Sequence, residues 1–138
     1  MRPVQLEIIS IADACLGGLR GHSALLIGPE EVRQPYKTLL QEAGMKAVFQ
    51  EQDYTRVPML LPQVQLLMNL SDQNAPPPLL TAALIAEGCV GRRTPLLIFD
   101  LAAATSVEEM AGLLPAVCLY TPSDLHQVLY ANTDARIA

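Results

Sequence analysis

Residues 23–31 read SALLIGPEE, and this stretch decides the fold. Its apolar run Ala24-Leu25-Leu26-Ile27 is typical of a strand that is buried on both faces, and Gly28 follows it directly. A helix is expected soon after the glycine. A buried strand, a glycine turn and a helix N-terminus form the start of a dinucleotide-binding unit, in which the turn holds a pyrophosphate against the helix N-terminus.

The turn departs from the glycine pattern that a dinucleotide needs. The pattern G-x-G-x-x-G would begin at Gly28-Pro29, but Glu30 and Arg33 stand where the second and third glycines belong. Two like charges about 4 Å apart repel by about 4 kcal/mol at an effective dielectric constant near 20, so a carboxylate at Glu30 opposes a bound pyrophosphate. Arg33 could pair with a phosphate, but we favour its pairing with Glu30 or Glu31, or its exposure to solvent.

Pro35 predicts a second change in the same helix. A proline beyond the first helical turn removes a backbone hydrogen bond and clashes with the preceding turn. We therefore expect Pro35 to lie in the first turn and the helix to begin near Val32 or later. The helix N-terminus would then be displaced by about one turn from its phosphate-binding place.

Short apolar segments alternate with helical ones along the rest of the chain. Strands are expected at 23–27, 46–50, 64–70, 96–100 and 116–120. Helices are expected at 4–16, from the glycine turn to residue 44, at 79–87, from residue 106 and from residue 121 or 123 to 132. The alternation predicts an α/β fold of three layers, Rossmann-like, with helices on both faces of a five-stranded parallel sheet. We expect the strand order 3-2-1-4-5 and a functional crevice at the carboxyl ends of the first and fourth strands.

Length and composition restrict the classes of protein. The 138 residues predict one domain, 1–138, and a net charge of −5 argues against nucleic-acid binding. Charged residues make up only 17% of the chain and hydrophobic residues 51%, which favours a surface covered in a homodimer or by a protein partner. No apolar run reaches the ~18 residues of a membrane span, and the N-terminus is not typical of a secretory signal. Cys15, Cys89 and Cys118 are far apart, which predicts buried free thiols in a reducing cytoplasm.

Further candidate ligands for a nucleotide follow the second and third strands. A ribose-binding acid is expected about 20 residues beyond the turn, where Glu51 and Asp53 lie, and Arg56 could favour a 2′-phosphate instead. All three can equally be ordinary surface residues. Asn69 lies at the end of the third strand, and Ser71, Asp72 and Asn74 follow it; they would line a nucleotide pocket, but Ser71, Asp72 and Asn74 are also what an ordinary turn contains.

No catalytic residue or metal site is assigned from the sequence. His22 and His126 lack a second ligand at metal-binding spacing and are interpreted as surface or capping residues. Asp100 ends the fourth strand, where it could be a general base, but we favour a role in capping the turn.

Four stretches together resemble a known family. They are 11–28, 39–44, 95–102 and 119–132. Their order and spacing are similar to those of the central NAD(P)-binding domain of glutamyl-tRNA reductase, which commits glutamate to tetrapyrrole synthesis. In that family a further N-terminal domain carries the catalytic cysteine and a C-terminal helix bundle dimerises, and the 138 residues hold neither.

The resemblance and the altered turn together predict a binding or regulatory module without catalytic activity, linked to tetrapyrrole metabolism. No cofactor is expected, with NADP as the alternative if one binds. The competing hypothesis is an NAD(P)(H)-binding subunit of a split oxidoreductase. An enzyme of this kind would be NADP-dependent and would need a partner chain to carry the nucleophile.

Overall fold

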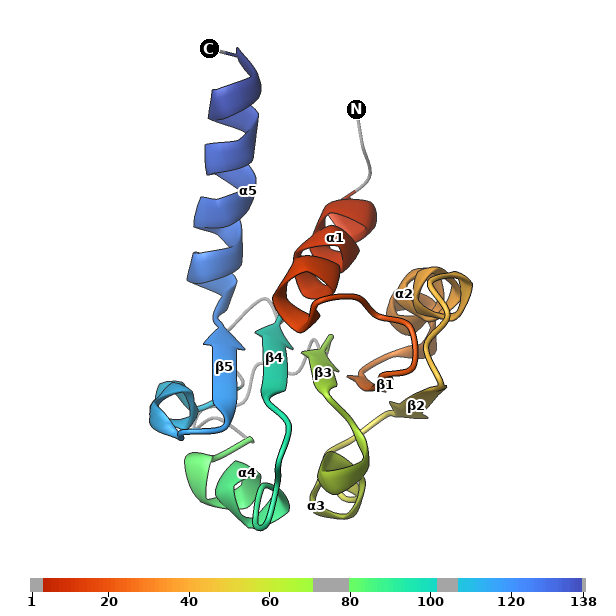
Figure 1. Cartoon of the computed structure of the whole chain (residues 1–138), viewed down its shortest axis with the longest axis vertical. Helices are drawn as coiled ribbons and strands as arrows, with labels where there is room; N and C mark the ends of the chain where they lie inside the picture. The colour runs from red at the N-terminus through yellow and green to blue at the C-terminus, as the bar shows by residue number, and fades with distance from the viewer. Residues whose placement is uncertain (1–3, 71–79, 102–106, 138) are drawn as a thin grey trace.

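The computed structural model describes residues 4–70, 80–101 and 107–137, with side chains described as far as residue 129. Five parallel strands form one sheet in the order β2-β1-β3-β4-β5 (Figure 1). The strands are β1 (Ser23–Ile27), β2 (Ala47–Glu51), β3 (Leu66–Asn69), β4 (Leu96–Asp100) and β5 (Val117–Tyr120). The predicted Rossmann-like α/β fold with a five-stranded parallel sheet is therefore confirmed.

The predicted strand order 3-2-1-4-5 is wrong. Leu25 of β1 pairs with Phe49 of β2 on one side and with Leu67 of β3 on the other, so β3 lies inside the sheet. Burial agrees with this arrangement, because every residue of β3 is buried whereas every residue of β2 is only partly buried. The sequence of β2 ends in Gln50 and Glu51, which suits an edge strand.

The corrected order moves the expected crevice. The connection from β1 leads outward to β2, whereas the connection from β2 passes back beyond β1 to β3, and ligands of open α/β sheets bind where the direction reverses. A ligand crevice is therefore expected at the carboxyl ends of β1 and β3, instead of β1 and β4.

Helices cover both faces of the sheet (Figure 1). They are α1 (Val4–Leu16), α2 (Glu30–Glu42), α3 (Val57–Leu60), α4 (Ala82–Gly88) and α5 (Pro122–Ile137), with two 3-10 helices, η1 (Leu61–Gln63) and η2 (Glu109–Leu113). The short helix expected from residue 106 corresponds in its described part to η2, and Ser106 itself lies outside the described residues. Helix α5 leaves the end of β5 and extends away from the sheet (Figure 1).

Two hydrophobic cores lie on opposite faces of the sheet. Ala24 and Leu26 of β1 pack in the core of α1 and α2, whereas Leu25 and Ile27 pack in the core of α3 and α4. Successive side chains of a strand point to opposite faces, so a strand between two helical layers must be apolar throughout. This accounts for the unbroken run that precedes Gly28.

Helix α2 begins at Glu30, so the expected displacement of its N-terminus is wrong. The N–H groups of Val32 and Arg33 donate to the carbonyl oxygen of Pro29 at 3.1 and 3.0 Å, which closes the first helical turn directly after the glycine turn. Pro35 lies inside the helix. The buried side chains of Arg33, Tyr36 and Leu40 share one face of α2, and their packing offsets the cost of about 3 kcal/mol that an interior proline carries.

Candidate nucleotide-binding site

The glycine turn after β1 is tied to the end of β2. Gly28 has φ 141°, a backbone conformation that residues with a side chain rarely adopt. Its N–H donates to the carbonyl oxygen of Glu51 at 3.0 Å. The turn therefore has a fixed path between the first strand and α2, and Gly28 is buried within it.

Arg33 fills the position of the third glycine with a buried side chain. Only 7% of Arg33 is exposed. Its Nε donates to the carbonyl oxygen of Gly28 at 2.7 Å, and its Nη1 donates to Oε1 of Gln50 in β2 at 3.1 Å. The prediction that Arg33 pairs with Glu30 or Glu31, or is solvated, is wrong, because its place on the inner face of α2 turns it toward the sheet.

Two carboxylates occupy the first turn of α2. Glu30 and Glu31 are both exposed, and no side chain caps this helix N-terminus. Among the described residues, neither carboxylate forms an ion pair within 4 Å. Negative side chains at a helix N-terminus interact favourably with the helix dipole. Glu30 and Glu31 therefore supply negative charge where a phosphate would otherwise bind.

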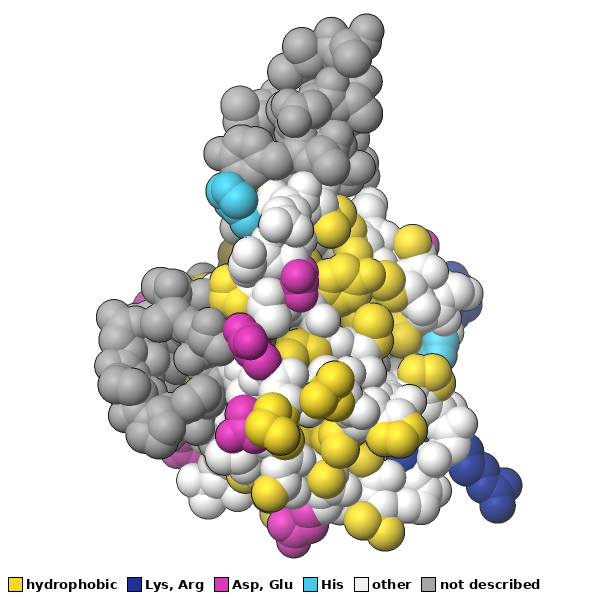
Figure 2. Space-filling view, turned by 90° about the vertical axis from the view of Figure 1, so that its left-hand side faces the viewer, with side chains coloured by type: hydrophobic (Ala, Val, Ile, Leu, Met, Phe, Trp, Pro, Cys, Tyr) yellow, Lys and Arg dark blue, Asp and Glu magenta, His cyan; other side chains and the backbone are white. Residues whose placement is uncertain are grey.

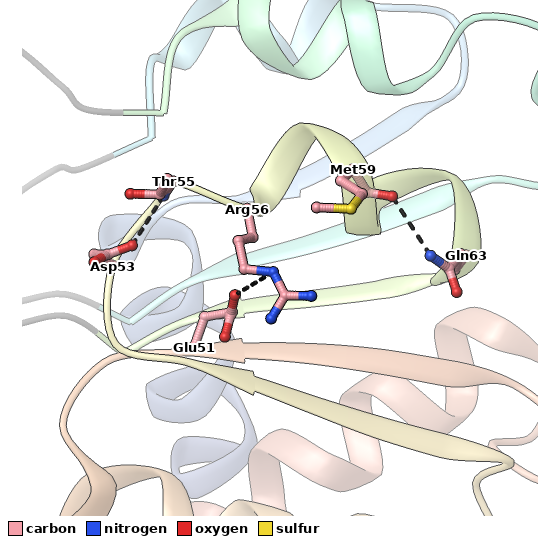
Figure 3. Close-up of polar contacts among 6 residues, drawn as sticks. All are labelled: Glu51, Asp53, Thr55, Arg56, Met59 and Gln63. Atoms are coloured by element: carbon pink, nitrogen blue, oxygen red, sulfur yellow. Dashed lines mark hydrogen bonds and ion pairs between the residues drawn. The ribbon is translucent and has the colours of Figure 1, made fainter.

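The end of β2 holds an ion pair where a ribose would lie (Figure 3). Oε1 of Glu51 lies 3.4 Å from Nε of Arg56, with the Glu51 side chain 18% exposed and that of Arg56 58% exposed. Asp53 Oδ1 accepts a hydrogen bond from the N–H of Thr55 at 3.0 Å (Figure 3), and the backbone and side-chain hydrogen bonds from Thr55 lower the pKa of Asp53. A ribose hydroxyl would therefore compete with Arg56 for Glu51, while Asp53 shapes its own turn.

A buried polar network joins the carboxyl ends of β3 and β4. Asn69 ends β3 and is in register with Ile27 of β1 and Asp100 of β4. Its Nδ2 donates to Oδ1 of Asp100 at 3.3 Å, and its Oδ1 accepts from the hydroxyl of Tyr54 at 3.0 Å. Both Asn69 and Asp100 are fully buried.

Asp100 has the structural role that the sequence predicted. Its Oδ2 accepts a hydrogen bond from the N–H of Val107 at 3.1 Å, which anchors the return of the chain after β4. The sequence analysis did not predict the network with Asn69 and Tyr54. The available signal was that two apolar strands, which prove to be neighbours, both end in a polar residue. Ser71, the other residue predicted to line the pocket, lies outside the described residues.

The remaining candidates do not gather at the crevice. Nδ1 of His22 lies 2.9 Å from the carbonyl oxygen of Gly18, in agreement with a capping role. The three cysteines are free, but the prediction that they are buried is wrong, because Cys15 and Cys118 are exposed and Cys89 is half-buried. Cys118 is exposed on β5, one of the two edge strands of the sheet. Within the described ranges no three acidic, histidine or cysteine residues are placed to hold a metal ion, and no helix could cross a membrane.

Comparison with known proteins adds to this geometry. No protein-family model matches the chain. The glutamyl-tRNA reductase of Methanospirillum hungatei is 28% identical over 145 residues, which cover 87% of this chain. That of Shewanella denitrificans is 26% identical over 152 residues, which cover 96% of it. The structure of the glutamyl-tRNA reductase from Methanopyrus kandleri superimposes on 97% of the chain with a TM-score of 0.78 at 21% identity.

The chain resembles the nucleotide-binding domain of glutamyl-tRNA reductase. It spans about a third of the length of these relatives: 34% of the Methanospirillum protein, 36% of the Shewanella protein and 38% of the Methanopyrus chain. The fold is shared more widely. The bifunctional methylenetetrahydrofolate dehydrogenase/cyclohydrolase of Campylobacter jejuni matches 89% of the chain with a TM-score of 0.67 at 16% identity. The NADPH-dependent glyoxylate/hydroxypyruvate reductase of Sinorhizobium meliloti matches 88% with a TM-score of 0.63 at 11% identity.

Proposed function

We propose that this chain is a binding or regulatory module without catalytic activity, related to glutamyl-tRNA reductase, that acts in tetrapyrrole metabolism in the cytoplasm. The observation that carries the proposal is the turn after β1, where Arg33 bonds to the carbonyl of Gly28 and Glu30 begins the helix. The module would act as a homodimer or through a protein partner.

Arg33 stands where a dinucleotide turn uses a glycine for close packing of the helix against the strand. The third glycine of the pattern lets the helix and strand pack closely beside the pyrophosphate. Here a buried guanidinium lies between α2 and β2 and bonds to the turn itself. The turn is therefore stabilised by the chain's own cation.

The negative charge at the second glycine position also opposes the binding of a dinucleotide. Glu30 carries its carboxylate on the first residue of α2, next to the place of the pyrophosphate. The repulsion of about 4 kcal/mol between two such anions is about half of the roughly 8 kcal/mol that corresponds to micromolar affinity. Glu31 adds a second carboxylate in the same turn.

The thiols support a role without covalent catalysis. Cys15 lies near the C-terminal end of α1, Cys118 lies on β5, and Cys89 follows α4. None of these positions is at the carboxyl ends of β1 and β3, where a substrate would meet a bound cofactor.

A second candidate function is the NAD(P)(H)-binding subunit of a split oxidoreductase. The helix start favours it, because α2 begins directly after the turn and its N-terminus has no side-chain cap. Such an N-terminus binds anions through its backbone N–H groups. Glu51 at the end of β2 is also where a ribose-binding acid belongs.

Calorimetric titration with NADPH and with NADH separates the two candidates. The proposed module should bind neither more tightly than about 10 μM, and Glu30→Gly should strengthen binding by at least tenfold, as expected for loss of a repulsion of about 1.4 kcal/mol or more. Glu87→Gln, an exposed change on α4, is the matched control and should leave affinity unchanged. Tight binding by the unmodified chain, with little gain from Glu30→Gly, would favour the oxidoreductase subunit.

A further inference from the structure

Strand β5 forms an edge of the sheet, and part of its backbone faces outward. The N–H of Leu96 donates to the carbonyl oxygen of Ala116 at 2.7 Å, and Leu97 is in register with Cys118. In a parallel ladder, alternate residues bond to the same neighbour. Cys118 and Tyr120 therefore bond toward β4, and the N–H and C=O of Leu119 point away from the sheet.

A hollow of about 480 Å³ lies beside this open backbone. Leu119 lines it, together with Gly112 and Leu113 from η2 and Thr121 and Asp124 from the start of α5. The hollow thus runs along the sheet edge between the 3-10 helix before β5 and the helix after it. The next element, α5, leaves the end of β5 and extends away from the sheet (Figure 1).

Exposed apolar side chains border the same edge. Leu113 is 81% exposed and Met110 is 64% exposed, both on η2. Figure 2 shows this side of the molecule, with apolar side chains gathered over it and acidic side chains beside them. Open edge strands next to apolar surface tend to pair with further chains, and natural proteins usually protect them with charge or cover.

The charges around the hollow indicate what kind of chain would pair. Glu109 lines the hollow at η2 and Asp124 at α5, and none of the described residues that line it is Lys or Arg. Oδ2 of Asp124 accepts from the N–H of Thr121 at 3.0 Å, which holds that carboxylate at the edge. A second copy of this chain, paired through the same edge, would bring these carboxylates against each other, so charge disfavours it.

We propose that the edge of β5 receives an extended segment of a partner protein as a sixth strand, with apolar residues in its middle and basic residues at its ends. Its backbone would pair with Leu119, its apolar side chains would lie against Leu113 and Met110, and its basic side chains would reach Glu109 and Asp124. This is strand addition, in which main-chain hydrogen bonds give affinity and side chains give specificity. The proposal goes beyond the nucleotide turn and does not depend on it.

The test uses the acetylated, amidated peptide KVTVTVK, titrated into the full chain and followed by NMR. The peptide should bind with a dissociation constant below about 1 mM and shift the amide signal of Leu119. The peptide EVTVTVE should bind at least about tenfold more weakly, since its charges oppose Glu109 and Asp124. KVTVTVK with N-methyl groups on alternate backbone nitrogens should not bind, because it cannot complete the ladder.

A pair of variants places the site. Leu113→Lys should abolish binding, whereas Val90→Lys, at a residue 82% exposed beyond α4, should leave it unchanged. Four results would each overturn the proposal: no binding of KVTVTVK at millimolar concentration, equal binding of the N-methylated peptide, equal binding of EVTVTVE, or a dimer in light scattering that Leu113→Lys dissolves. The last result would assign the edge to a second copy. Because no nucleotide enters this test, its outcome is separate from that of the NADPH titration.

Discussion

Nε of Arg33 donates to the carbonyl oxygen of Gly28 at 2.7 Å, across the turn that joins β1 to α2. The same side chain reaches Gln50 on the neighbouring strand. A residue at the position of a missing glycine thus links the turn, the helix and β2. The residue that we propose to oppose nucleotide binding also helps to hold this corner of the fold together.

Removal of this link should destabilise the protein. Arg33→Ala leaves the buried carbonyl of Gly28 without this donor, and we expect the free energy of unfolding to fall by about 1–3 kcal/mol in urea titrations. Arg56→Ala is the control, because the Arg56 side chain is 58% exposed in its ion pair with Glu51 and should contribute at most about 1 kcal/mol. Equal losses for the two variants would mean that the Arg33 contacts are not formed in solution.

Replacement of the interior proline of α2 should have the opposite effect. Pro35→Ala restores an N–H that can donate to the carbonyl of Glu31, and we expect a gain of about 1–2 kcal/mol after allowing for the more flexible unfolded chain. Pro29→Ala should give no gain, since Pro29 lies at the N-cap with φ −61°, the angle that proline favours. A loss of stability in Pro35→Ala would show that α2 does not run unbroken from Glu30.

The buried network below the crevice should depend on the hydroxyl of Tyr54. Tyr54→Phe removes the donor to Oδ1 of Asn69 while keeping the ring, and should cost about 0.5–1.5 kcal/mol in urea unfolding. Asp100→Ala should cost more, because it removes the acceptor of both the Asn69 amide and the N–H of Val107. If Asp100→Ala cost less than Tyr54→Phe, Asp100 would not be the anchor of the loop after β4.

Two tyrosines should titrate late. Burial raises the pKa of Tyr36 from 10.0 to about 12, and the hydrogen bond with Cys15, followed by burial, raises the pKa of Tyr120 to about 12. Between pH 10 and about pH 12 these two tyrosines are ionised in the unfolded chain but still protonated in the folded one. The stability that they contribute is therefore present below pH 10 and is lost as the pH rises through about 12.

Absorbance at 295 nm would follow both ionisations, assigned with Tyr36→Phe and Tyr120→Phe. Cys15→Ala should lower the pKa of Tyr120 and leave that of Tyr36 unchanged, because Sγ of Cys15 lies 3.5 Å from the hydroxyl of Tyr120, whereas the pKa of Tyr36 is raised by burial. If Cys15→Ala lowered the pKa values of both tyrosines, the change would indicate a general loosening of the fold instead of the loss of one contact.

The sequence predicted the strands well because their apolar runs are long enough to be recognised one at a time. The order of the strands depended on a comparison between them: β3 is apolar up to Asn69, whereas β2 ends in Gln50 and Glu51 and can tolerate an edge. This difference between the two sequences indicates which strand lies inside the sheet. General preferences for strand order do not take it into account.

The sequence showed which residues replace the glycines of the turn, but the predicted start of α2 and the predicted exposure of Arg33 were wrong. The rule for proline predicted a late helix start, but three inward residues of α2 hold the helix around Pro35. A charged residue at a helix start is usually exposed, so the burial of Arg33 could not be predicted without the acceptors at Gly28 and Gln50, which only the folded chain brings together.

Under the proposed function, the turn after β1 does not bind the pyrophosphate of a dinucleotide. The most direct test is an NMR titration of the full chain with NADPH, observed at the backbone amides of Gly28, Glu30 and Glu31. We predict that these signals do not move at 1 mM NADPH, a concentration that would half-fill a site with a dissociation constant of about 1 mM. Large shifts confined to these three amides, saturating at micromolar NADPH, would mean that the pyrophosphate rests on the turn, and would contradict the account.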